Sequence, residues 1–161
     1  MLLDSKHVQR AVLGGAFLGG GGGGRAASGM ALGNLALEVG QPQLVPLSEL
    51  APGDLIVTVS SVGAPAARDQ YVKPADYADA LQLLQERVGG RVAGIISSEN
   101  GGHSTLNGWF QSALTGIPVI DAACNGRAHP TGVMGSMGLD TVQGFTSLQA
   151  AIGGQPRAGR R

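Results

Sequence analysis

The chain has a single cysteine, few aromatic residues and no net charge, and each of these features excludes particular kinds of protein. Its one cysteine, Cys124, excludes an internal disulfide or a site made of several cysteines, and fits a reducing compartment. Aromatic residues make up only 4 % of the sequence, so aliphatic side chains must build the core. Eleven basic and eleven acidic residues leave no net charge, which removes the main electrostatic reason to expect nucleic acid or an anionic membrane as a partner.

Long apolar runs are also missing. No stretch approaches the roughly 18 apolar residues of a membrane-spanning helix, and the charged opening MLLDSKHVQR lacks the apolar centre of a signal peptide. We therefore expect a cytoplasmic protein. Its 161 residues are enough for one domain, which we place at residues 1–152, followed by a disordered tail at 153–161.

Glycine is abundant instead, and six glycines in a row occupy positions Gly19 to Gly24. Such a run costs conformational entropy, so it is disfavoured unless the backbone must bend tightly or approach another group closely. We favour a ligand-facing loop whose N–H groups bind an anion at the start of the next helix. The alternative is a flexible linker. The run fits neither the phosphate-loop nor the dinucleotide motif, so the cofactor stays unassigned.

The spacing of apolar residues predicts an α/β protein. Helical spacing covers residues 5 to 14 or 18, 28–39, 74–88 and 104–115, and short β-branched runs predict strands at 44–47, 55–59, 91–97 and 117–120. A further strand is predicted at 139–142. Because helices alternate with the strands, we expect parallel pairing. The fold class is a three-layer, mostly parallel sheet flanked by helices.

Polar residues collect in three loops that follow predicted strands: Gly63-Ala64-Pro65, Glu99 to Ser104, and Asp121 to Pro130. In open α/β sheets, ligands bind outside the carboxyl ends of the strands. We therefore predict that these loops meet in one site. Glu99 is a candidate base or metal ligand there, or a carboxylate that stabilises the start of the following helix.

The other polar residues of these loops leave alternatives open. His103 and His129, with Glu99 and Asp121, could supply a metal site, but their spacing matches no standard metal motif and no metal is assigned. Cys124 is either a thiol activated by neighbouring charge or a small buried hydrophobic residue.

Arg127 is flanked by the small residues Gly126 and Ala128. Its guanidinium could therefore reach a carboxylate or an imide-like ligand through two parallel hydrogen bonds. Pairing of the same side chain with Asp121 is the alternative.

Taken together, four motifs resemble one known family. They are Leu18-Gly19 to Gly24, Val62-Gly63-Ala64-Pro65, Glu99-Asn100-Gly101-Gly102, and Val119-Ile120-Asp121 with Gly126-Arg127-Ala128-His129-Pro130. In this order, over about residues 5 to 145, they are similar to the N-terminal domain of the S-methyl-thiohydantoin desulfurase-like family. The resemblance implies an α/β fold and chemistry on a small cyclic amide or thioamide such as a hydantoin. Family members are typically longer and carry a second domain.

The chain also departs from the family pattern. Arg25 and Ala26 stand where the family has an acidic residue and a proline, and Ala123 stands where it has a second aspartate. Ser104 and His129 replace an asparagine and an aromatic residue.

These observations lead to two functional hypotheses. In the first, the chain is an enzyme or enzyme subunit, a hydrolase or desulfurase, in which Glu99 activates water or removes a proton. Asp121 and His129 complete the catalytic group, and Arg127 holds the substrate. Backbone amides contribute further binding, with these candidates: Gly21, Gly22, Gly63, Gly101 and Gly102.

In the second hypothesis, the chain is a non-catalytic subunit that binds a small ligand or a partner. Under either hypothesis we expect a small-molecule ligand, and a homo-oligomer or a partner subunit that supplies a second domain.

Overall fold

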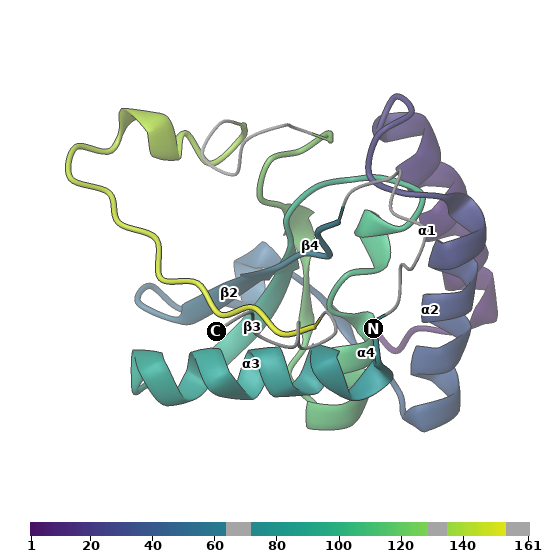
Figure 1. Cartoon of the computed structure of the whole chain (residues 1–161), viewed down its shortest axis with the longest axis horizontal. Helices are drawn as coiled ribbons and strands as arrows, with labels where there is room; N and C mark the ends of the chain where they lie inside the picture. Colours follow the sequence, from purple (N-terminus) through teal and green to yellow (C-terminus); the bar gives the residue numbers. More distant parts are fainter. Residues whose placement is uncertain (64–71, 129–134, 154–161) are drawn as a thin grey trace, which may run out of the picture.

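The computed structural model describes residues 1–63, 72–128 and 135–153. Its centre is a parallel sheet with the spatial strand order β1-β4-β3-β2 (Figure 1). The strands are β1 (Leu44–Pro46), β2 (Leu55–Val59), β3 (Val92–Ser97) and β4 (Val119–Ala123). The α/β class and the parallel pairing predicted from the sequence are confirmed. β1 lies at an edge of the sheet, where Pro46, which has no N–H group to donate, is tolerated.

Two helices precede the first strand and two lie between later strands, and they largely match the predicted ranges. They are α1 (Ser5–Leu18), α2 (Ala26–Val39), α3 (Pro74–Val88) and α4 (Trp109–Thr115). α1 continues through Gly14 and Gly15 to the glycine run rather than ending at these two residues. Within the described ranges, every helix is too short or too polar to cross a lipid bilayer.

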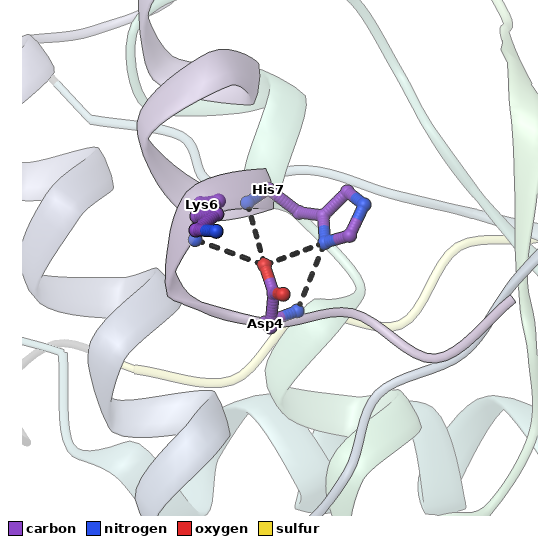
Figure 2. A network of polar contacts seen from close by, with 3 residues as sticks. All are labelled: Asp4, Lys6 and His7. Carbon is purple, nitrogen blue, oxygen red and sulfur yellow. Dashed lines mark hydrogen bonds and ion pairs between the residues drawn. The ribbon is translucent and has the colours of Figure 1, made fainter.

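The first helix is fixed by a capping box at its start (Figure 2). The Asp4 carboxylate accepts hydrogen bonds from the backbone N–H groups of Lys6 (2.9 Å) and His7 (3.0 Å). Nδ1 of the His7 ring lies 2.7 Å from Oδ1 of Asp4 and 3.2 Å from the Asp4 backbone nitrogen. These contacts satisfy N–H groups that have no partner inside the helix.

α3 and α4 lie on one face of the sheet, and both hydrophobic core clusters pack against that face. β2, β3 and β4 follow one another across the sheet in one direction, so right-handed crossovers bring α3 and α4 to the same face. Ile95 of β3 packs in a cluster with Leu81 of α3. Its register partner on β4, Val119, packs with Val12 of α1 and Trp109 of α4. Neighbouring residues of parallel strands point to the same side, so both clusters lie on one face.

The helix predicted over residues 104–115 is interrupted. A 3₁₀ turn, η2 (Ser104–Leu106), is followed by an extended Asn107 and by Gly108 with φ +95°, and only then does α4 begin. Gly108 approaches the sheet so closely that a Cβ there would lie 2.8 Å from Cγ2 of Ile95. Leu106 and Trp109, on either side of the break, are both buried. The apolar pattern therefore runs across the break, which is why the sequence predicted one continuous helix.

The strand predicted at 139–142 is wrong, since this segment forms a 3₁₀ turn, η3 (Leu139–Thr141). The turn starts at Gly138, which has φ +60°, and the Thr141 hydroxyl donates to the Gly138 carbonyl at 2.7 Å. Local hydroxyl-to-backbone bonding such as that of Thr141 competes with strand formation.

Another 3₁₀ turn, η1 (Leu47–Glu49), follows β1.

Candidate functional site

The glycine run packs directly on the loop that follows β3. The Gly23 carbonyl accepts hydrogen bonds from the backbone N–H groups of His103 (3.0 Å) and Ser104 (2.9 Å). Gly23 has φ +72°, and a Cβ on Gly101 would lie only 2.3 Å from its Cα. Only glycine in both segments permits this close approach of the two backbones. The run is therefore part of the folded domain, in contrast to the linker alternative.

The loop after β4 meets the same two segments. Asn100 donates both its backbone N–H (2.9 Å) and its Nδ2 (2.7 Å) to the Gly126 carbonyl. Next along the chain, the Arg127 guanidinium lies over Gly20, where a Cβ would be 2.8 Å from Nη2. The Ala128 methyl group similarly faces Gly22. Three segments distant in sequence thus converge at the carboxyl ends of β3 and β4.

Glu99 is held beside the glycine run by a hydroxyl group. The Ser104 hydroxyl lies 3.2 Å from Oε1 of Glu99 and 3.1 Å from the Gly23 carbonyl oxygen, so it can donate to either. The hydroxyl of Ser97, at the end of β3, lies 2.9 Å from the backbone carbonyl oxygen of Glu99 and 2.6 Å from that of Ser104, so it can donate to either and helps to fix the loop. The carboxylate is half-buried.

Asp121 and Arg127 occupy different surroundings. Asp121 is exposed on β4 opposite Pro46, and it lines a hollow together with Met1 and Leu44. No ion pair joins Asp121 to Arg127 in the described part of the chain, where the one ion pair found is Asp4 with His7. The Arg127 side chain is exposed.

The other predicted residues divide into packed and open positions. A Cβ on Gly102 would lie 2.9 Å from the backbone nitrogen of Ala26, so its lack of a side chain serves packing. Gly21 and Gly63 have open space at the corresponding position, and a ligand can approach them. His129 lies outside the described residues. The roles assigned to all of these residues stay predictions.

The structure also bears on the two chemical alternatives that the sequence left open. Among the described residues, no group of three or more His, Cys, Asp or Glu side chains could hold a metal ion. Cys124 is buried, and its backbone N–H donates to the Ser97 carbonyl at 3.1 Å. These surroundings match the interpretation of Cys124 as a small hydrophobic residue.

Sequence reasoning missed a polar group that joins the end of β2 to η2. The Ser61 hydroxyl lies 3.4 Å from Nε2 of His103 and 3.3 Å from Oδ1 of Asn107. Burial lowers the pKa of His103 below its ordinary value of 6.5, and the backbone of Ser28 offsets part of this effect. The detectable signal was the position of Ser61, directly after a buried strand.

A larger hollow lies at the opposite edge of the sheet. It has a volume of about 490 Å³ and is lined by residues at the amino ends of the strands, including Leu55, Arg91 and Pro118. In open parallel sheets, ligands bind at the carboxyl ends. We therefore look for ligand binding at the glycine run and the loops packed on it. Arg91 is a cationic residue at the other end of the strands, far from the glycine run.

Comparisons with known proteins bear on the family and the fold of this chain. The family model described as S-Me-THD-like, N-terminal domain, matches residues 6–155. A crystal structure of a protein from Chromobacterium violaceum is similar in fold, with a TM-score of 0.66 and 25 % sequence identity over 81 % of this chain. The chain spans 36 % of that protein's length. A comparison with curated proteins found no match.

Proposed function

The chain belongs to the S-Me-THD-like family through its N-terminal domain, and on this premise we propose that it is an enzyme or enzyme subunit that acts on a small cyclic amide or thioamide. The proposed substrates are hydantoin- or thiohydantoin-like rings, and the reaction is hydrolytic or desulfurising. Both kinds of ring present a polar carbonyl or thiocarbonyl that becomes more negative when a nucleophile attacks.

One observation supports the proposal: the glycine run, the loop after β3 and the loop after β4 pack together, with Glu99 and Arg127 both beside the run. Glu99 is held next to Gly23 through the Ser104 hydroxyl. The Arg127 guanidinium lies over Gly20. A carboxylate and a guanidinium around bare backbone supply what a small polar ring needs for orientation and activation.

Each residue has a proposed role in this reaction. Arg127 holds the substrate's carbonyl or a ring carboxylate by parallel hydrogen bonds. The open backbone at Gly21 stabilises negative charge that develops on the substrate, and Glu99 activates water or removes a proton. Asp121 and His129 complete the catalytic group in this proposal.

Ligand-induced stabilisation tests the proposal. The purified chain would be heated with hydantoin, 2-thiohydantoin and 5-oxoproline in turn, and melting followed by the fluorescence of its one tryptophan. A ligand at about 100 times its Kd adds about 2.7 kcal/mol to the free energy of unfolding, which is about 5 to 10 °C in a chain of this size. We expect this shift with a cyclic amide or thioamide.

The matched variants are Arg127→Ala and Arg91→Ala. Each removes one cationic side chain, the first at the carboxyl ends of the strands and the second at their amino ends. The shift should vanish in Arg127→Ala and persist in Arg91→Ala. Absence of a shift with every ring compound would contradict the proposal. Binding without ring opening or sulfide release would instead support the alternative, a non-catalytic binding subunit.

We also propose that the protein acts in the cytoplasm and associates with a second copy or with a subunit that supplies a second domain. The support is that the chain spans 36 % of the similar crystal structure's chain. Light scattering of the purified chain separates the two forms of association, because a mass of 16.2 kDa indicates a monomer that awaits another subunit.

A further inference from the structure

We propose that Ser61 is a nucleophile and His103 its general base, so that the site opens a cyclic amide through an acyl-serine intermediate. This assignment deepens the proposed function and rests on it for the nature of the substrate, but it gives the role of base to His103 in place of Glu99. The two residues come from different loops at the carboxyl edge of the sheet, Ser61 after β2 and His103 after β3.

The Ser61 hydroxyl lies between two side chains that can accept its proton. Its Oγ lies 3.3 Å from Oδ1 of Asn107 and 3.4 Å from Nε2 of His103. A hydroxyl has one proton and turns freely about its Cβ–Oγ bond, so the proton can be directed to either acceptor. Bonds between a nucleophile and its base are often this long before a substrate binds. Asn107 acts as a positioning residue that holds the hydroxyl near the imidazole.

A buried amide group with an unpaired atom lies next to this hydroxyl. Asn107, whose Oδ1 lies 3.3 Å from the Ser61 hydroxyl, is only 3 % exposed, yet its Nδ2 has no hydrogen-bond partner among the described residues. Oε1 of Gln111, which is 5 % exposed, also lacks a partner in that part of the chain. Buried polar atoms are normally paired, since leaving one unpaired costs about 1 to 3 kcal/mol. The unpaired Nδ2 of Asn107 therefore supports a ligand site beside the Ser61 hydroxyl.

His103 is suited to accept a proton at neutral pH. Burial lowers its pKa below 6.5, so the imidazole is largely neutral in the cell. Its Cβ packs against Gly24, where any side chain would collide with it, and this contact fixes the ring next to the glycine run. His103 therefore contacts both Ser61 and the glycine run of the proposed site.

The reaction balances with water as the one co-reactant. The Oγ of Ser61 forms a bond to the ring carbonyl carbon while its proton passes to Nε2 of His103. The carbon–nitrogen bond of the ring then breaks, and the ring nitrogen takes that proton. Water attacks the resulting ester with His103 again as base, and the proton returns to Oγ as the carbon–Oγ bond breaks. The product is one opened-ring molecule that carries a carboxylic acid at one end of the broken bond and an amine or urea nitrogen at the other.

A fluorophosphonate tests the nucleophile without any assumption about the substrate. Such a probe forms a phosphorus–oxygen bond with an activated serine and releases fluoride, and mass spectrometry of the digested chain locates the label. We expect the label on Ser61 in the natural chain, at a rate that rises with pH through a midpoint below 6.5 as His103 becomes neutral.

Two pairs of variants sharpen the result. Ser61→Ala should abolish labelling, whereas Ser60→Ala, one residue away, should leave it unchanged. His103→Gln should slow labelling about 100-fold or more, and His7→Gln, at the start of α1, should not. Far-ultraviolet circular dichroism checks that each variant is folded.

No label on Ser61, or labelling of His103→Gln at the natural rate, overturns the inference. That failure differs from failure of the proposed function: a chain that is stabilised by a cyclic amide but resists the fluorophosphonate would keep the substrate class and lose the serine mechanism.

Discussion

Two adjacent residues of α1 show how closely this chain depends on the absence of side chains. Gly14 is exposed, and a Cβ there would meet nothing within 4 Å. Gly15 is buried, and a Cβ there would lie 2.3 Å from both the Gly101 carbonyl oxygen and Oγ1 of Thr105. One glycine is therefore a helix-weakening surface residue, and the other is a contact point between α1 and the site.

This contrast predicts opposite effects of the same substitution. Gly14→Ala should raise the free energy of unfolding by about 0.5 to 1 kcal/mol, because alanine favours the helix. Gly15→Ala should lower it by about 1 to 3 kcal/mol, because the methyl group overpacks against backbone that cannot easily move. Urea unfolding of both variants measures the difference. Equal effects at the two positions would show that α1 does not rest on the Gly101 loop.

The half-buried imidazole of His103 predicts how stability changes with pH. Its folded-state pKa is lowered, so between that value and 6.5 the unfolded chain binds more protons than the folded chain. The free energy of unfolding should therefore fall as the pH is lowered through this window and stay constant with respect to His103 above it. Urea unfolding at about pH 7.5 and about pH 5 tests this expectation.

His103→Gln is the control for that experiment, because glutamine carries no titrating group. The variant should lose less stability than the natural chain between the two pH values. If both lose the same amount, His103 does not contribute to the pH dependence.

At the scale of single elements, the start of α1 depends on one carboxylate. Asp4 accepts from two backbone N–H groups, and these bonds lower its pKa below 3.8. Asp4→Ala should lower the melting temperature by about 2 to 4 °C. Asp4→Asn should retain most of the stability, because asparagine caps as well as aspartate. Differential scanning calorimetry compares the three proteins, and an Asp4→Ala variant as stable as the natural chain would contradict the role of the cap.

Elements were predicted well wherever a local pattern determines them. The strand at 55–59 and the helix at 74–88 have the predicted bounds because turn residues and a proline mark their ends. The break at Gly108 escaped prediction because its cause, close contact with Ile95 on β3, is a tertiary one. The 3₁₀ turn at Leu139–Thr141 escaped because a short apolar segment suits either structure.

The candidate site was predictable in position but not in its internal contacts. Loops that follow parallel strands meet at one edge by topology, and this brought Glu99 and Arg127 to the glycine run. The sequence could not reveal that Asp121 faces the outer strand β1, since that depends on the strand order. Nor could it reveal the contact between Ser61 and His103, which are 42 residues apart in the sequence.

At the scale of the whole molecule, the sheet joins the two hydrophobic clusters into one core. Val57 and Ile95 belong to the cluster under α3, and Val119 belongs to the cluster under α1, α2 and α4. Ile95 is the direct neighbour of both Val57 and Val119 in the sheet. A continuous core of this kind favours cooperative unfolding, as expected for the single domain predicted at residues 1–152.

Trp109 makes this cooperativity measurable, because the chain has one tryptophan and it is 4 % exposed in the cluster under α1, α2 and α4. Leu81→Ala removes a buried side chain from the other cluster and should cost about 2 to 5 kcal/mol. In a cooperative domain, the urea midpoints from Trp109 fluorescence and from circular dichroism should fall together. Val12→Ala, in the cluster of Trp109, provides the matched comparison. If Leu81→Ala shifts the dichroism transition and leaves the fluorescence transition in place, α3 and its strands unfold as a separate unit.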